Sequence, residues 1–341
     1  MNINTNFNLK HFNTFGIDVN CFNFIEYSNN EEIIQFLKQN KDILKNNFLI
    51  LGNGSNILFT KDFEGTIIHP TTNKITILSE KDENILLSAE AGLNFDEFII
   101  WTLNNGIFGL ENLSDIPGCV GASAVQNVGA YGVEAGDFIR SVTYLNLETF
   151  DIETIEKKNC NFSYRNSIFK NELKNKTLIL SIIFELKKFF IPNLSYAEVK
   201  NKFTYLQENQ EIQNAYNLRN LIMDIRSSKL PDYKKFGNAG SFFKNPIISK
   251  TKYNELKEYF PDVKYFDYDY ENVKIAAGWL IDFCGFKGFC YKGAAVHDKQ
   301  ALIIINKNNS QPSDILEIAK IIQTKVFDTF GISLSPEVIF V

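Results

Sequence analysis

Two glycine-rich segments constrain the fold of this chain more than any other feature. The first, LGNGSN at residues 51–56, lies between two short apolar runs that predict strands. Gly52-Asn53-Gly54 begins like a dinucleotide-binding fingerprint, but Ile57 stands where the third glycine belongs, and a predicted strand follows instead of a helix. The sequence also contains no G-x-x-x-x-G-K-[ST] pattern. These observations exclude a P-loop and disfavour a Rossmann fold.

The second segment, residues 107–136, is too rich in turn residues to form one regular element. Backbone N–H groups hold phosphates well, and glycine lets the main chain come close to a ligand. Taken alone, either segment is more often a tight turn than a ligand site. Together, with Ser, Asn or Gln beside the glycines, they indicate a large ligand with several phosphates.

Helical and strand patterns are mixed around these segments without a steady β-α-β alternation, which favours an α+β fold. At roughly 150 residues per domain, the length of 341 residues predicts two or three domains. The spacing of apolar residues predicts helices over 31–40, 95–106, 211–231 and 314–331. Apolar runs predict strands within 48–59, 67–93, 139–147, 177–186, 301–306 and 337–341, and residues 190–215 predict polar helix or loop.

Composition excludes several classes of function. With 35 Lys and Arg against 40 Asp and Glu, the net charge is −5, which argues against nucleic-acid binding but allows a local basic pocket. The five cysteines are widely spaced and the three histidines scattered, so we expect free thiols and no metal site. The polar N-terminal residues and the short apolar runs indicate a cytoplasmic protein without membrane contact.

A series of motifs follows the chain from end to end: NTFGID (13–18), LGNGSN (51–56), IPGCVGASAVQNVGAYG (116–132), YRNSIF (164–169), KLPD (229–232), GNAGSFFKNP (237–246), AAGWLID (276–282) and SPEV (335–338). Together these motifs resemble the MurB family, the UDP-N-acetylenolpyruvoylglucosamine reductases. The resemblance thus covers nearly the whole chain. Its one visible departure is Ala124, where many relatives have proline.

The resemblance implies a two-lobed FAD-binding domain of the vanillyl-alcohol oxidase (PCMH) type, followed by a smaller α+β substrate-binding domain. We expect the FAD-binding domain over residues 1–195, with a boundary between its lobes near 65–70. A tyrosine loop and linker would occupy 196–220. The substrate-binding domain would occupy 221–341, with Glu337 on its terminal strand.

The activity implied by the resemblance is the reduction of UDP-N-acetylglucosamine enolpyruvate to UDP-N-acetylmuramate in peptidoglycan precursor synthesis, which serves cell-wall biogenesis, cell shape and cell division. NADPH would reduce FAD, and hydride would then reach the terminal vinyl carbon of the substrate. Ser241 corresponds to the proton donor for the adjacent carbon. Arg165 and Glu337 correspond to the residues that stabilise the enolate-like charge, for which a guanidinium offers a planar fork.

Ligand contacts are implied in the same way. The substrate-binding positions are Tyr196, Lys229, Asn245, Tyr265 and Gln300. The cofactor-binding positions are Gly52, Asn53, Gly54, Ser55, Asn56, Pro117, Gly118, Gly121, Ala122, Gln126, Asn127 and Gly129. No histidine has the context of covalently flavinylated relatives, so we expect non-covalent FAD in a monomeric protein.

Two other functions remain open from the residues alone. One is a related FAD-dependent oxidase, which has no use for a proton donor such as Ser241. The other is a non-catalytic protein that binds a sugar nucleotide or flavin. Each singled-out residue also has an ordinary structural explanation: a turn serine, a surface arginine, or a glutamate on an edge strand.

Overall fold

The computed structural model describes residues 1–209 and 214–341 and divides the chain into two compact units. Unit 1 comprises Met1–Phe7, Cys21–Asn53 and Glu64–Ser228, and unit 2 comprises Asn8–Asn20, Gly54–Phe63 and Lys229–Val341. One passage between the units falls within the glycine segment 51–56. Residues 210–213, which belong to the predicted linker and to the start of the predicted helix 211–231, lie outside the described residues. The predicted domain boundaries stay a prediction.

The N-terminal strands form a four-stranded sheet. Its order is β1 (Asn2–Asn8), β2 (Asn20–Tyr27), β5 (Phe63–Pro70) and β3 (Phe48–Ile50), with β3 and β5 parallel. Helix α1 (Asn30–Gln39) buries Ile33 and Leu37 in the core of this part, and α2 (Asp42–Lys45) follows. The side chain of Asn29 accepts the N–H of Glu32 and so begins α1. The helix predicted over 31–40 is confirmed.

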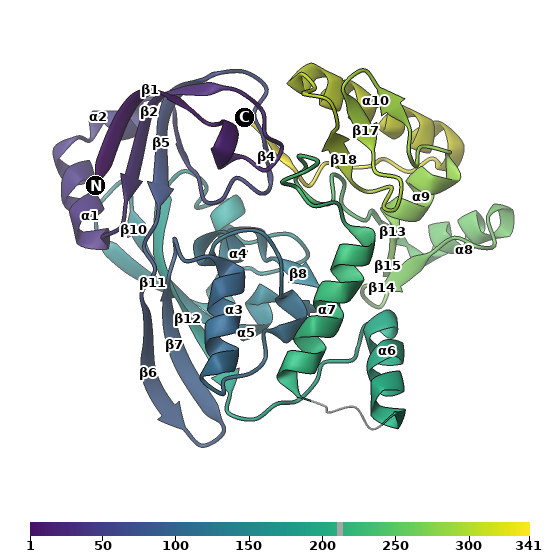
Figure 1. Cartoon of the computed structure of the whole chain (residues 1–341), viewed down its shortest axis with the longest axis horizontal. Coiled ribbons are helices and arrows are strands. Elements are labelled where there is room, and N and C mark those ends of the chain that lie inside the picture. The colour runs from purple at the N-terminus through teal and green to yellow at the C-terminus, as the bar shows by residue number, and fades with distance from the viewer. Residues whose placement is uncertain (210–213) are drawn as a thin grey trace. The chain divides into compact units, whose positions relative to one another are not determined.

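A five-stranded antiparallel sheet forms the larger part of unit 1. Its order is β11 (Ile152–Glu156), β10 (Ile139–Asn146), β12 (Thr177–Lys187), β7 (Asn84–Glu90) and β6 (Ile75–Lys81). Alternate residues of β7, namely Ile85, Leu87 and Ala89, enter the core. Helices α3 (Phe95–Asn104), α4 (Val120–Gln126) and α5 (Ala135–Phe138) lie on one side of this sheet (Figure 1). The core of unit 1 is therefore closed by the segments that carry the second glycine-rich region.

Two further helices complete unit 1. Helix α6 (Ala197–Glu208) packs Val199 and Phe203 against Leu218 and Ile222 of α7 (Ala215–Lys229). The prediction of a polar helix within 190–215 is confirmed, as is the helical part of 211–231 that the structure describes. The short elements of the loops are β8 (Gly129–Ala130), β9 (Val133–Glu134) and the 3₁₀ turns η2 (Glu111–Leu113), η3 (Lys157–Asn159) and η4 (Ile168–Lys170).

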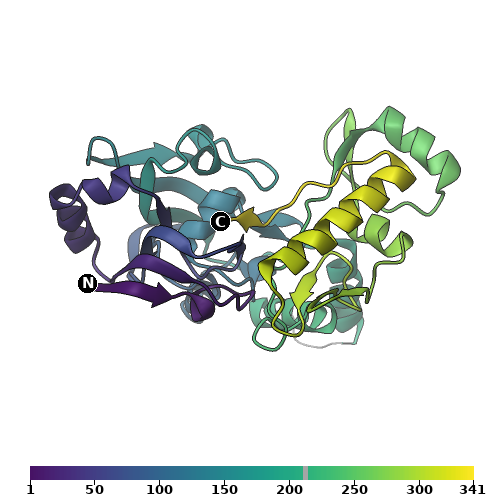
Figure 2. The same ribbon diagram turned by 90° about the horizontal axis from the view of Figure 1, so that it is seen from above.

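Unit 2 contains two three-stranded sheets and the C-terminal helix. One sheet has the order β13 (Ile247–Ser249), β15 (Asn272–Ile275), β14 (Tyr265–Asp267), with α8 (Lys250–Tyr259) beside it. The other has the order β16 (Cys290–Tyr291), β17 (Ala294–Val296), β18 (Ile304–Asn306), with α9 (Ala277–Phe283) nearby. Helix α10 (Pro312–Phe330), the long yellow helix of Figure 2, packs on β17 and β18. Strand β19 (Ile339–Phe340) pairs in parallel with β4 (Ile57–Leu58). The 3₁₀ turn η1 (Lys10–Phe12) follows β1 in the chain.

Two predicted strands are shorter than their apolar runs suggested. The prediction for 301–303 is wrong because the N–H of Ile303 donates to the carbonyl of Gln300 and closes a turn, so the strand begins at Ile304. The terminal strand begins at Ile339 rather than Glu337, whose N–H donates to Phe242. In both places the apolar side chains correctly predict burial. Whether the segment forms a strand depends on which backbone groups its N–H and C=O groups bond to.

The structure contains no helix long and apolar enough to span a bilayer anywhere in residues 1–209 or 214–341. Within the same described residues, no group of three or more His, Cys, Asp or Glu side chains is arranged to hold a metal ion. The five cysteines are unpaired by disulfides, and three of them are buried, namely Cys21, Cys119 and Cys160.

A buried ion pair fastens α7 to α3. Arg219 donates from both terminal nitrogens to the two carboxylate oxygens of Asp96, at 2.6 and 2.7 Å. The same carboxylate accepts the N–H of Asp115 at 2.6 Å. Burial alone would raise the pKa of Asp96, but the bonds from Arg219 and Asp115 hold this pKa below its ordinary value of 3.8.

The substitution Asp96→Asn should lower the free energy of unfolding of unit 1 by about 3 kcal/mol, because it leaves the Arg219 charge buried without its partner. A lowered folded-state pKa stabilises the protein above the unfolded pKa of 3.8, and the stabilisation is lost as the pH falls through the folded value. The difference between wild type and variant should therefore shrink below about pH 4. Urea unfolding followed by Trp101 fluorescence, in a Trp279→Phe background, measures this difference.

Glu97→Gln is the matched control, because Glu97 is exposed beside Asp96 on the first turn of α3. Its urea midpoint should match that of the background protein. A midpoint for Asp96→Asn that is equally unchanged at neutral pH would contradict the role given to this ion pair.

Candidate functional site

The two glycine-rich segments meet in unit 1. The side-chain amide of Asn53 donates to the carbonyl of Gly118 at 3.2 Å. A Cβ added to Gly52 would lie 2.6 Å from the Cys119 sulfur, and one added to Gly121 would lie 2.9 Å from the Cβ of Ala91. At both positions a side chain larger than that of glycine would overlap its neighbour. The structure thus places Gly52 and Asn53 next to the segment that carries Gly118 and Gly121.

The remainder of the first segment belongs to unit 2. Gly54 has φ +61°, and a Cβ there would collide with the carbonyl oxygen of Phe12. The carbonyl of Gly54 accepts the N–H of Thr14 at 3.1 Å. Ser55 and Asn56 follow directly, and the Asn56 amide donates to the carbonyl of Glu337 at 3.3 Å. The segment therefore runs from the glycine cradle of unit 1 to the backbone of a predicted catalytic residue in unit 2.

Asn127 ends α4 in the left-handed conformation, with φ +47°. Its side chain donates to Glu134 at 2.5 Å and to the carbonyl of Ser163 at 3.0 Å, and it accepts the N–H of Gly136 at 2.8 Å. The side chain is 1% exposed. This amide therefore holds the turns of the second glycine-rich segment together.

Arg165 lies at the tip of a tight turn next to this segment. Ser163 and Asn166 exchange both backbone hydrogen bonds, at 3.1 and 3.0 Å, and Arg165 has φ +54°. A long side chain in this conformation is uncommon, and such positions gather at functional sites. The guanidinium donates to the carbonyl of Gly129 at 2.7 Å. Its plane is thereby set by the glycine-rich backbone.

Lys170 was missed by the sequence reasoning. Its ammonium donates to the side chain of Gln126 at 2.6 Å and to the carbonyl of Arg165 at 3.3 Å. It joins one predicted cofactor contact to one predicted catalytic residue. The signal was its position directly after YRNSIF, where η4 turns the chain back toward α4.

Ser241 and Glu337, 96 residues apart in the chain, are brought together in unit 2. The N–H of Phe242 donates to Leu302, and the carbonyl of Phe242 accepts the N–H of Glu337, both at 2.8 Å. The rings of Phe242 and Phe243 are buried, with centroids 5.1 Å apart. Ser241 itself is exposed, after Gly240 with φ +69°. The serine is therefore held on a backbone fixed from both sides and close to the backbone of Glu337.

Asn245 and Gln300 both lie beside the start of α9. The side-chain oxygen of Asn245 accepts the N–H of Ala277 at 2.9 Å. The side-chain oxygen of Gln300 accepts the N–H of Leu302 at 3.4 Å and would lie 3.1 Å from a Cβ on Gly278. Both predicted substrate contacts therefore belong to the neighbourhood of the Ser241 segment.

The other predicted substrate contacts are placed separately. Lys229 is the last residue of α7, and Tyr196 precedes α6, its ring edge-on to that of Tyr131 at 5.3 Å. Tyr265 on β14 packs against Tyr253 of α8, with ring centroids 4.5 Å apart. Because side chains alternate along a strand, Phe266 takes the opposite face of the sheet.

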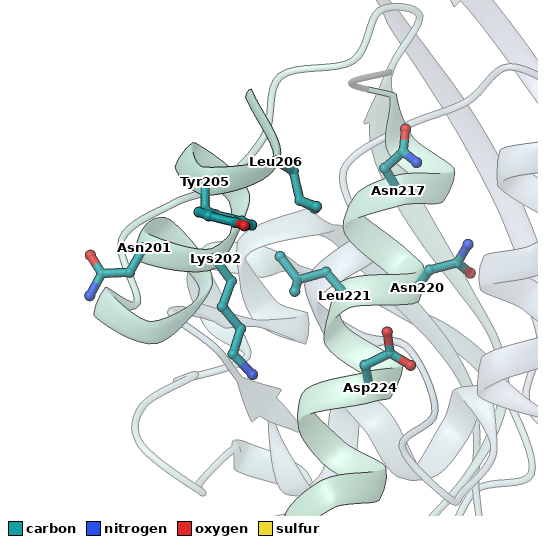
Figure 3. Close-up of a pocket in the computed structure, with 8 residues that line it drawn as sticks. All are labelled: Asn201, Lys202, Tyr205, Leu206, Asn217, Asn220, Leu221 and Asp224. Carbon is teal, nitrogen blue, oxygen red and sulfur yellow. The ribbon is translucent and has the colours of Figure 1, made fainter. Parts of the chain in front are cut away.

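A groove of about 530 Å³ opens between α6 and α7 (Figure 3). Its lining combines asparagine amides, one positive and one negative side chain, a tyrosine and two leucines. These residues are Asn201, Lys202, Tyr205, Leu206, Asn217, Asn220, Leu221 and Asp224. None of the predicted site residues that the structure describes contributes to this lining. The groove is therefore separate from the residues assigned above.

Gly52→Ala should weaken the glycine cradle, since the new methyl group would overlap the Cys119 sulfur. We expect the purified variant to lose most of its absorbance near 450 nm, the signature of bound FAD, at equal protein concentration. Cys119→Ala in the same chain should restore it, because the Cys119 Cβ lies 3.9 Å from the added methyl group. A double variant as poor in flavin as Gly52→Ala would show that the Gly52–Cys119 approach is not what shapes the cradle.

Comparison with known proteins agrees with this arrangement. Residues 231–341 match the C-terminal domain of the UDP-N-acetylenolpyruvoylglucosamine reductase family, and residues 24–149 match an FAD-binding domain. The crystal structure of UDP-N-acetylenolpyruvylglucosamine reductase (MurB) from Thermus caldophilus aligns with 99% of this chain and 98% of that chain, at a TM-score of 0.67 and 18% identity. The α+β fold predicted from the motifs, with its FAD-binding and substrate-binding parts, is confirmed.

Curated relatives match along the full length. The chain is 41% identical over 339 residues to the UDP-N-acetylenolpyruvoylglucosamine reductase of Flavobacterium johnsoniae, and the match covers 99% of each chain. It is 42% identical over 329 residues to the reductase of the same name from Neisseria gonorrhoeae, covering 96% of this chain and 94% of that one. The chain therefore belongs to the MurB family of UDP-N-acetylenolpyruvoylglucosamine reductases.

Proposed function

We propose that this protein reduces UDP-N-acetylglucosamine enolpyruvate to UDP-N-acetylmuramate with NADPH, and that it does so in the cytoplasm as a monomer. The full-length identity with relatives named for this reductase activity carries the proposal. The backbone pairing of the Ser241 and Glu337 segments supports it, because the reaction needs a proton donor close to a group that controls developing negative charge. An oxidase would need no such pair.

The glycine cradle suits non-covalent FAD. FAD, when bound, supplies the redox chemistry by taking hydride from NADPH and giving it to the terminal vinyl carbon. A pyrophosphate needs main-chain N–H groups that it can approach closely, and the two glycine-rich segments lie next to each other at Gly52, Asn53 and Gly118. We assign the cofactor to Gly52, Asn53, Gly54, Ser55, Asn56, Pro117, Gly118, Gly121, Ala122, Gln126, Asn127 and Gly129.

Ser241 is proposed to protonate the carbon next to the one that receives hydride. A serine hydroxyl is a weak acid, so it donates only to a strongly basic carbon in the transition state. Such a donor must be placed well, and the hydrogen bonds of Phe242 on both sides give Ser241 a fixed backbone. General acid catalysis of this kind contributes about 10² to 10⁴ in rate.

Arg165 and Glu337 are proposed to control the charge that builds up before protonation. The Arg165 guanidinium, oriented by the carbonyl of Gly129, presents a planar fork that matches a carboxylate and its enolate form. The backbone of Glu337 is fixed by two hydrogen bonds: its carbonyl accepts the side-chain amide of Asn56, and its N–H donates to the carbonyl of Phe242. We assign its carboxyl group to the control of that charge.

Substrate recognition is proposed to rest on five residues. Lys229 offers a compact positive charge for the UDP pyrophosphate. Asn245 and Gln300, near one another at α9, offer amides for hydrogen bonds, and Tyr196 and Tyr265 offer aromatic surface with a hydroxyl. Because the whole chain has a net charge of −5, a local positive charge such as that of Lys229 is needed to attract an anionic substrate.

Ser241→Ala should slow the reoxidation of reduced flavin by the enolpyruvyl substrate by about 10² to 10⁴, because the proton donor is lost. Reduction of the flavin by NADPH should stay within about twofold of wild type, since it needs no proton from Ser241. Anaerobic stopped-flow absorbance measures the two half-reactions separately. Ser333→Ala, an exposed serine of unit 2, is the control and should change neither rate. Equal slowing of both half-reactions by Ser241→Ala would remove the proton-donor assignment.

Glu337→Gln keeps the shape of the side chain but removes the carboxyl group, so it should slow turnover by about 10² while FAD content stays unchanged. Flavin absorbance per protein and steady-state kcat are the two measurements. Loss of the cofactor from this variant would show that Glu337 supports the fold of the flavin site instead of the chemistry.

A further inference from the structure

The imidazole of His69 holds the start of the first glycine-rich segment. His69 lies near the end of β5, and its Nδ1 lies 2.7 Å from the carbonyl oxygen of Leu51. A carbonyl oxygen can only accept a hydrogen bond, so Nδ1 carries the hydrogen and donates it. The N–H of Leu51 donates to the carbonyl of Ile68 at 3.0 Å. Both backbone polar groups of Leu51 are therefore bonded to residues of β5, directly before Gly52.

The Leu51–Gly52 peptide determines where the first N–H of the glycine cradle points. A peptide unit is planar and trans, so its C=O and its N–H point in opposite directions. Because His69 holds the carbonyl of Leu51, the N–H of Gly52 points away from His69. A rotation of this peptide would present a carbonyl oxygen where the N–H now points. Such an oxygen repels a phosphate, whereas an N–H group binds it.

The second glycine-rich segment is arranged in the same way. The carbonyl of Gly118 accepts the N–H of Phe95 at 3.1 Å and the side-chain amide of Asn53 at 3.2 Å. The N–H of the same peptide, which belongs to Cys119, therefore points the opposite way. The two segments are neighbours here, since a Cβ added to Gly52 would lie 2.6 Å from the Cys119 sulfur. In both segments a donor thus holds the carbonyl of a glycine peptide and fixes the direction of its N–H.

The freedom of a glycine backbone makes such a hold necessary. Without a Cβ, Gly52 restricts the peptide that precedes it less than a larger residue would. A donor in a fixed position offsets this freedom. The His69 ring is such a donor, because it is half-buried and lies against the ring of Phe24, with centroids 5.5 Å apart. Phe24 itself is 1% exposed and so belongs to the rigid interior.

We propose that His69 is a positioning residue for the cofactor: its Nδ1–H holds the carbonyl of Leu51 and so keeps the N–H of Gly52 turned toward the FAD pyrophosphate. The inference rests on the proposed function, because Gly52 is assigned to the cofactor only there. His69 itself need not touch FAD. A side chain that donates from the same place should replace it, and one that only fills its space should not.

Two substitutions separate the hydrogen bond from the packing of the ring. His69→Asn loses the ring but keeps a donor, because the amide nitrogen of asparagine is as many bonds from Cβ as Nδ1 of histidine. His69→Phe keeps a ring beside Phe24 but has no donor. Dilution of the flavin-loaded proteins, with FAD release followed by flavin fluorescence, gives the dissociation constant of FAD. It should rise about tenfold in His69→Phe, which loses one hydrogen bond, and stay within about twofold of wild type in His69→Asn.

Glu64→Gln is the control, since Glu64 is exposed on the same strand, and it should leave the dissociation constant unchanged. An unchanged dissociation constant in His69→Phe would overturn the inference, as would an equal increase in both variants, which means that the ring matters and not the donor. If His69→Phe is insoluble, His69→Leu replaces it under the same criteria, because leucine also has no donor. A wild-type protein that binds no FAD would overturn the proposed function itself; a flavin-loaded wild type with unaltered variants overturns this inference alone.

Discussion

Close approach of distant segments at glycines where no Cβ fits is the constraint on which this structure depends. Gly52 faces Cys119, Gly121 faces Ala91 and Gly54 faces Phe12, and in each case an added Cβ would overlap its neighbour. Such contacts bring segments from distant parts of the chain close together. Segments rich in glycine also leave main-chain N–H groups accessible, which is what a pyrophosphate requires.

A second consequence concerns the proposed catalytic residues. Arg165 belongs to unit 1, and Ser241 and Glu337 belong to unit 2. Each is fixed through its backbone or through a backbone partner: Arg165 by Gly129, and the other two by the hydrogen bonds of Phe242. Precise placement of a weak acid such as serine matters more than its intrinsic acidity. The buried rings of Phe242 and Phe243, with centroids 5.1 Å apart, anchor the residues that follow Ser241.

Local features of the fold were predictable and distant pairings were not. The helix over 95–106 followed from its apolar spacing and from Gly106, which indeed has φ +68° after the helix end. The strand over 301–303 failed because burial alone does not reveal a turn. The meeting of Ser241 and Glu337 depends on backbone bonds across 96 residues, which no spacing rule contains. Lys170 was missed for the same reason, because its partner Gln126 lies 44 residues away in the sequence.

The central claim is that one bound flavin carries hydride from NADPH to the enolpyruvyl substrate. The most direct measurement is an anaerobic titration of the purified protein with known amounts of NADPH and then of UDP-N-acetylglucosamine enolpyruvate, with absorbance at 450 nm and product followed together. The account predicts that one equivalent of NADPH bleaches the flavin, and that one equivalent of substrate restores its colour while one equivalent of UDP-N-acetylmuramate forms. A bleached flavin that regains its colour only when oxygen is admitted would contradict it.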